Sequence, residues 1–101
     1  MKVPSIFIGD DDGRIGTLLG RILKLQQYEV HYVQSVNEAL NVLAHSSFDL
    51  YLPDYRFQDG TGLELAHYLR GKGCNAPIIL ISVYYTQDLE PDVKALNISH
   101  Y

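Results

Sequence analysis

Apolar runs of strand length alternate with segments of helical period along the whole chain, and this alternation limits the possible folds most strongly. The runs that predict strands are Ser5–Ile8, Tyr28–Val33, Phe48–Leu52 and Pro77–Ser82. After each run, apolar residues recur at intervals of three and four, as on one face of a helix. The repeated order strand–helix predicts an α/β fold, a doubly wound parallel sheet with right-handed crossovers and helices on both faces.

Local signals support the predicted helices. The first helix has a single apolar face made by Ile15, Leu18, Leu19, Ile22 and Leu23. Gly20 lies within this pattern and costs about 1 kcal/mol relative to alanine, so the helix depends on packing. Ser35 with Glu38, and Thr61 with Glu64, have the spacing of capping boxes. Pro91 is tolerated in the first turn of a fourth helix.

Size, charge and cysteine content narrow the class of protein. The 101 residues suit one domain, and the 12 acidic against 8 basic residues argue against direct binding to nucleic acid. Cys74 is the one cysteine, so an internal disulfide cannot form, and a reducing, cytoplasmic setting is expected. The sequence has no apolar run of about 18 residues and no signal peptide, so no membrane partner is expected.

Carboxylates follow two strands that should be neighbours. Asp10–Asp12 lie just past the first predicted strand, Asp54 lies just past the third, and Ser82 ends the fourth. The carboxyl ends of such strands meet at one sheet edge, where ligands of doubly wound folds bind. Clustered carboxylates repel unless a hard cation neutralises them, and Mg²⁺ prefers oxygen ligands. The alternative interpretation of Asp10–Asp12 is a solvated turn that contains a helix N-cap and binds no cation.

Four segments together resemble the receiver domain of bacterial two-component response regulators. They are "IFIGDDD", "FDLYLPDYRFQDGTGLEL", "PIILIS" and "DLEPDVKALNISHY", and the similarity extends over essentially the whole chain. The resemblance implies a flavodoxin-like receiver fold with strand order 2-1-3-4-5. It also implies a phosphorylation-dependent signalling switch rather than an enzyme.

The resemblance assigns roles to individual positions. Asp54 would be the phosphoacceptor that takes a phosphoryl group from a sensor histidine kinase or phosphotransfer protein. Mg²⁺ would be held by Asp10, Asp11, Asp54 and the backbone carbonyl of Arg56. Ser82 would contact the phosphoryl group, and Tyr101 would be the switch aromatic. Asp12 is expected to be a cap or turn residue, and an output domain or effector protein would read the switch.

Several positions depart from the family pattern. Pro53 precedes Asp54 where an aliphatic residue is usual, and it should remove one strand hydrogen bond. Gln58 replaces a common loop proline, and Val83 replaces a small residue.

The family's lysine, expected about three residues past Tyr101, lies beyond this sequence. We therefore expect residues 1–101 to form a receiver domain that lacks most of the fifth strand and the fifth helix. Its exposed sheet edge should favour self-association.

Two other functions are compatible with the sequence. The first is a receiver-like interaction module that no longer depends on phosphorylation, which the departures at Pro53 and Val83 favour. The second is an aspartyl phosphatase, but that class needs an aspartate two residues after the nucleophile, where this chain has Arg56. The four histidines lack metal-ligand spacing, and Cys74 has no nearby base, so structural roles are expected for them.

Overall fold

The computed structural model describes residues 3–81 and 87–100 of the chain. The strands are β1 (Ser5–Gly9), β2 (Glu29–Val33), β3 (Leu50–Pro53), β4 (Arg56–Phe57), β5 (Gly60–Thr61), β6 (Ile79–Leu80) and β7 (Ser99–His100). The helices are α1 (Gly13–Leu25), α2 (Val36–Leu43), α3 (Gly62–Gly71) and α4 (Glu90–Ala95), and a 3₁₀ turn spans Gln87–Leu89. No described helix is long and apolar enough to cross a membrane.

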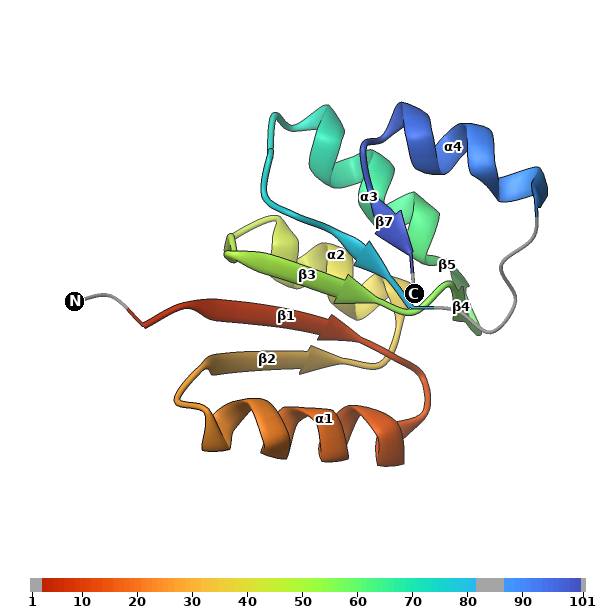
Figure 1. Ribbon diagram of the computed structural model, residues 1–101. Coiled ribbons are helices and arrows are strands. Elements are labelled where there is room, and N and C mark those ends of the chain that lie inside the picture. The colour runs from red at the N-terminus through yellow and green to blue at the C-terminus, as the bar shows by residue number, and fades with distance from the viewer. Residues whose placement is uncertain (1–2, 82–86, 101) are drawn as a thin grey trace.

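Parallel strands form the centre of the molecule in the predicted order (Figure 1). β1 lies between β2 and β3, and β6 pairs in parallel with β7. Two isolated parallel bridges, Tyr51 to Ile78 and Asp54 to Ile81, place β6 beside β3. The spatial order is therefore β2-β1-β3-β6-β7, which confirms the predicted order 2-1-3-4-5 because β6 and β7 are the fourth and fifth parallel strands. The short antiparallel pair β4–β5 was not predicted.

The two faces of the sheet bury different sets of side chains. Phe7, Tyr51, Ile78 and Leu80 lie on one face and are at most 2% exposed. They form one apolar cluster with residues of α2, α3 and α4. Ile6 and Ile8 have the opposite strand parity, so they point to the other face, where α1 packs against β1 and β2. Helices therefore lie on both faces, as the alternation of the sequence predicts.

Side-chain caps begin the two central helices. Thr61 accepts a hydrogen bond from the Glu64 N–H, and Glu64 accepts one from the Thr61 N–H, so this predicted capping box is complete. At α2 the Ser35 hydroxyl accepts from the Glu38 N–H, but the Glu38 carboxylate accepts from Gln34 N–H rather than from the cap residue. In the second predicted box, therefore, the glutamate accepts from the residue before the cap instead of from the cap residue itself.

Pro53 interrupts the pairing of β3 with β6. The Tyr51 N–H donates to Pro77 O, and the Tyr55 N–H donates to Ile81 O. Every second residue of this segment donates its N–H to the neighbouring strand, so the donor between Tyr51 and Tyr55 would be residue 53, toward the Ile79 carbonyl. Proline has no N–H and cannot make this bond. β6 covers only Ile79–Leu80 of the predicted strand Pro77–Ser82, where it pairs with β7, and single bridges at Ile78 and Ile81 join this segment to the β3 side.

Candidate metal and phosphoryl site

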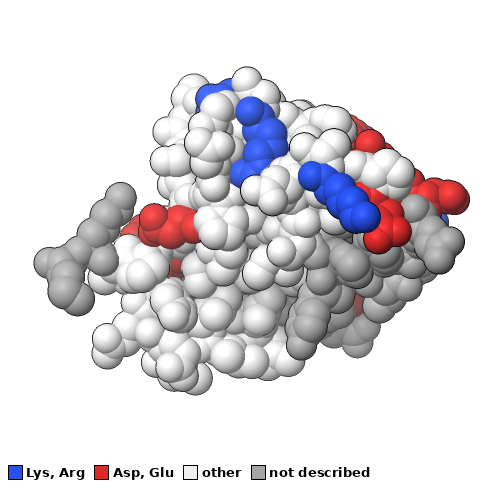
Figure 2. Space-filling view, turned by 45° about the horizontal axis from the view of Figure 1, so that its top comes forward, with Lys and Arg blue, Asp and Glu red and all other residues white. Residues whose placement is uncertain are grey.

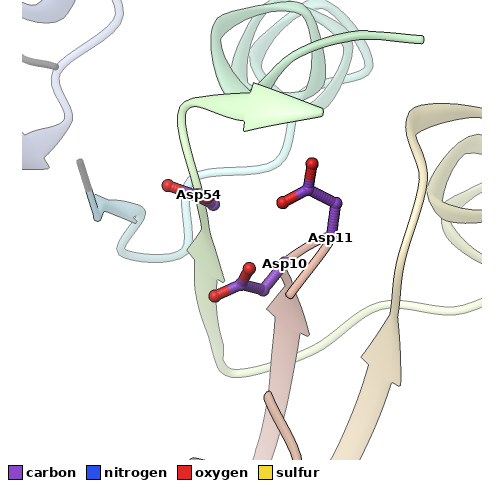
Figure 3. A group of neighbouring side chains, drawn as sticks. All are labelled: Asp10, Asp11 and Asp54. Atoms are coloured by element: carbon purple, nitrogen blue, oxygen red, sulfur yellow. The ribbon is translucent and has the colours of Figure 1, made fainter. Parts of the chain in front are cut away.

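Three carboxylates meet at the carboxyl edge of the sheet. Asp10 and Asp11 follow β1, Asp54 follows β3, and one carboxylate oxygen from each lies within 4.8 Å of the others. Figure 3 shows the three side chains at adjoining strand ends. Their convergence follows from the parallel register, which pairs Gly9 with Pro53 and so brings the residues after them together.

Asp10 is the most buried member of this group, with 8% of its surface exposed. Its carboxylate accepts a hydrogen bond of 2.8 Å from the Asp12 N–H, which favours the charged form. Burial outweighs that bond, and the charges of Asp11 and Asp12 add to its effect, so the pKa of Asp10 is raised. A cation bound beside Asp10 would stabilise the charged form of this carboxylate.

Asp54 is half-buried beside Asp10. Burial, followed by repulsion from Asp10, raises the pKa of Asp54 from 3.8 to about 6. Hydrogen bonding from the backbone N–H groups of Tyr55 and Arg56 opposes the increase, and the Tyr55 bond measures 2.8 Å. The Asp54 N–H donates to Gly9 O at 2.7 Å, which fixes the main chain of the predicted phosphoacceptor against β1.

A close approach by α3 also holds the main chain at Asp54. A Cβ atom at Gly62 would lie 2.2 Å from Asp54 O, so only glycine allows α3 to begin here. The Gly62 N–H in turn donates to Tyr55 O at 2.8 Å. The Asp54 backbone is therefore fixed from two sides, and its side chain is left at the sheet edge.

The remaining predicted residues differ in how far the structure describes them. Asp12 directly precedes α1, and its carbonyl accepts from the Gly16 N–H, as expected of a residue at a helix start. Arg56 begins β4 two residues after Asp54, and its carbonyl role stays a prediction. Ser82, Val83 and Tyr101 lie outside the described residues, so their predicted roles stay predictions as well.

Two residues near the site were not found from the sequence. The Asp59 carboxylate accepts from the N–H groups of Val36 and Asn37, which connects the loop after Asp54 to the start of α2. The Tyr32 hydroxyl reaches the backbone between β1 and α1. The Asp59 contact with Val36 joins residues 23 apart in the sequence, and the Tyr32 contact with Asp10 joins residues 22 apart. No local pattern therefore indicates either of them.

A family model for the response regulator receiver domain matches residues 6–101. The chain belongs to this family. Receiver domains are signalling domains, generally not classed as enzymes, that bind Mg²⁺ at an acidic pocket and interact with histidine kinases and output domains. The predicted family and the receiver fold are both confirmed.

Known proteins resemble the chain in both sequence and structure. Response regulator protein PilR of Pseudomonas aeruginosa is 35% identical over 88 residues, which are 87% of this chain and 20% of PilR. The receiver domain of HemR from Leptospira biflexa has a TM-score of 0.88 at 26% identity, over 96% of this chain and 78% of that one. These curated relatives are longer than the chain, which spans 20% of PilR and 36% of the swarming motility regulation protein RssB of Serratia marcescens.

A third similar structure is the response regulator TrrA of Thermotoga maritima, solved in complex with Mg²⁺-BeF. It has a TM-score of 0.82 at 28% identity, over 98% of this chain and 84% of that one. In our chain the three converging aspartates offer only oxygen ligands, and two of them have raised pKa values. An all-oxygen donor set with excess negative charge fits Mg²⁺.

Proposed function

We propose that this receiver domain is a phosphorylation-dependent switch in which Asp54 accepts a phosphoryl group from a histidine kinase or phosphotransfer protein. Asp10, Asp11, Asp54 and the Arg56 carbonyl would hold Mg²⁺. The observation that carries the proposal is the convergence of the Asp10, Asp11 and Asp54 carboxylates at one sheet edge. When bound, Mg²⁺ would offset the charge of the phosphoryl oxygens.

The chemistry requires an ionised Asp54. With a pKa of about 6, its carboxylate is mostly charged at neutral pH and can act as the nucleophile. One carboxylate oxygen forms a bond to phosphorus while the bond from phosphorus to the donor's imidazole nitrogen breaks, which leaves an acyl phosphate on Asp54. Ser82 would donate a hydrogen bond to the new phosphoryl group, and Tyr101 would respond to the movement of Ser82.

The proposal also covers the partners of the protein and its location. The cognate kinase would act in the cytoplasm, and an output domain or effector protein would read the phosphorylated state. A phosphate-independent interaction module is the second candidate. The interrupted pairing of β3 and β6 at Pro53, immediately before Asp54, is the observation that favours it.

Intact-mass measurement after incubation with acetyl phosphate and Mg²⁺ tests the proposal. The wild type should gain one phosphoryl group, and Asp54→Asn should not. Asp88→Asn removes an exposed carboxylate remote in sequence and should behave as the wild type. Equal uptake by wild type and Asp54→Asn would exclude Asp54 as the acceptor, and no uptake by either would favour the interaction module.

A further inference from the structure

The Tyr32 hydroxyl ties β2 to the loop that carries the acidic residues. Tyr32 lies opposite Ile8 in the parallel register, and its hydroxyl donates toward Asp10 O at 2.9 Å and Asp12 O at 3.3 Å. These two carbonyls flank Asp11 on its two sides. A single side chain therefore restrains the main chain both before and after Asp11, whose own side chain is exposed.

The ring of Tyr32 reaches this position only because residue 16 is glycine. A Cβ atom at Gly16 would lie 2.0 Å from Cε1 and 2.6 Å from the hydroxyl oxygen of Tyr32. The ring thus occupies the space that a side chain of α1 would fill.

The bond to the acidic loop acts together with a second restraint. The Asp10 N–H donates to Val33 O at 3.0 Å, and the Asp12 N–H donates to the Asp10 carboxylate at 2.8 Å. The second of these bonds holds the Asp10 side chain and the peptide between Asp11 and Asp12, and the Gly16 N–H holds the Asp12 carbonyl, so the peptide between Asp10 and Asp11 is the one left to be held from β2. The Tyr32 hydroxyl supplies that restraint, since its shorter contact is with the Asp10 carbonyl, which belongs to this peptide.

We propose that Tyr32 is a positioning residue that holds the Asp11 carboxylate in place for the divalent cation. This inference rests on the proposed function, because it assigns Asp11 to the Mg²⁺ site. Without the hydroxyl, the loop must be ordered when the ion binds, and that ordering reduces affinity. Tyr32 touches neither the ion nor the phosphoryl group, so its effect passes through the backbone of the loop.

Tyr32→Phe tests the inference because it keeps the ring against Gly16 and removes only the hydroxyl. Isothermal titration with Mg²⁺ should show binding about three- to tenfold weaker than wild type, the size of one hydrogen bond. Tyr28→Phe removes the hydroxyl of an exposed tyrosine before β2 and should bind as the wild type does. In the metal-free protein, the amides of Asp11 and Asp12 should exchange with solvent faster in Tyr32→Phe than in Tyr28→Phe.

Asp11→Ala separates the two proposals. If it weakens Mg²⁺ binding while Tyr32→Phe leaves affinity and amide exchange unchanged, the metal site stands and the positioning role is wrong. If wild type does not bind Mg²⁺, both proposals fail. If Tyr32→Phe speeds amide exchange without changing affinity, the tie is purely structural and the positioning role is again wrong.

Discussion

The two glycines of α1 at positions 16 and 20 have different surroundings. A Cβ atom at Gly16 would overlap the Tyr32 ring, whereas one at Gly20 would lie 3.8 Å from Val30 Cγ1, an ordinary contact. The same substitution should therefore have opposite effects at positions four residues apart. Gly16 allows a close approach, while Gly20 carries the conformational cost of glycine without needing its small size.

Gly20→Ala should stabilise the protein by about 1 kcal/mol, the helix propensity gain. Gly16→Ala should destabilise it by about 1–3 kcal/mol, because the ring must move. Urea denaturation measures both. In a Tyr32→Ala background the overlap is gone, so adding Gly16→Ala should now stabilise. Loss of stability from Gly16→Ala in that background would show that the ring is not the cause.

Asp54 makes the stability of the metal-free protein depend on pH. Its pKa of about 6 in the folded state exceeds 3.8, so the folded state binds the proton more tightly than the unfolded state. The stabilising effect of that proton is fully present below about pH 4 and is lost as the pH rises through about 6. Above this window the ionised Asp54 destabilises the fold.

Asp54→Asn should therefore be more stable than the wild type at pH 7.5 in EDTA, by about 1 kcal/mol once solvent screening is allowed for. The difference should shrink toward zero as the pH is lowered to about 4. Mg²⁺ at pH 7.5 should stabilise the wild type and have little effect on the variant. Thermal melts across this range measure the trend, and a difference independent of pH would contradict it.

Among the elements, α3 is joined to the α4–β7 turn by one side chain. Arg70 donates four hydrogen bonds of 2.8–3.0 Å, to the carbonyls of Leu96 and Asn97 on one side and of Cys74 and Ala76 on the other. The guanidinium fork reaches four acceptors at once, which an ammonium group with three donors cannot do. Arg70 therefore connects the end of α4 to the segment that leads into β6.

Arg70→Lys should cost about 2 kcal/mol, because charged hydrogen bonds are lost and carbonyls are left unpaired. Arg21→Lys, on an exposed position of α1, should cost far less. Chemical denaturation compares the two. Hydrogen exchange should also show a less protected Ile98 amide in Arg70→Lys, since that amide donates to Val93 O at the same turn. Equal costs for the two variants would argue against this role.

The break in the β3–β6 pairing gives a second prediction at the scale of elements. Pro53→Val supplies the missing N–H opposite Ile79 at similar side-chain volume. The new hydrogen bond and the lost rigidity of proline nearly cancel, so stability should change by less than about 1 kcal/mol. The amide of residue 53 should be strongly protected from exchange. An unprotected amide would mean that the missing N–H of proline is not what removes this hydrogen bond, since the Pro53 carbonyl already accepts from the Ile81 N–H.

The whole molecule covers the two faces of its sheet unequally. Leu50, Leu52, Ile79 and Ile81 share the strand parity of Ile6 and Ile8, and all four are only partly buried, whereas Tyr51, Ile78 and Leu80 on the other face are at most 2% exposed. In Figure 1, α2 and α3 lie behind these strands and no described helix lies in front of them. Figure 2 presents a side of the molecule on which uncharged residues predominate. Partly exposed aliphatic side chains gathered on one face of a sheet favour association.

We expect the 101-residue chain to self-associate through this face. Sedimentation velocity should show a mass that rises with protein concentration, and the variant Leu52→Thr/Ile79→Thr should reduce the rise. Leu25→Thr removes an aliphatic side chain that is 81% exposed on α1 and should leave the association unchanged. A wild type that stays monomeric at all concentrations would contradict the expectation.

The architecture could be predicted from the residues alone, because hydrophobic periodicity and side-chain caps act locally. The alternation of apolar runs predicted the parallel sheet, and the order of motifs such as "IFIGDDD" indicated the family. The same order placed Asp10, Asp11 and Asp54 at strand ends that must be neighbours. Even the interruption at Pro53 could be predicted, since the lack of an N–H is a property of the residue alone.

The way the acidic loop is held and the way the sheet is covered could not be predicted, because both depend on contacts between distant segments. The tie from Tyr32 to the Asp10 carbonyl and the cap from Asp59 to α2 join distant segments, so their existence depends on the final packing. The same is true of the raised pKa of Asp54, because burial and the charge of Asp10 arise only when the strands pair. Distances between residues far apart in sequence set these energies, and periodicity does not encode such distances.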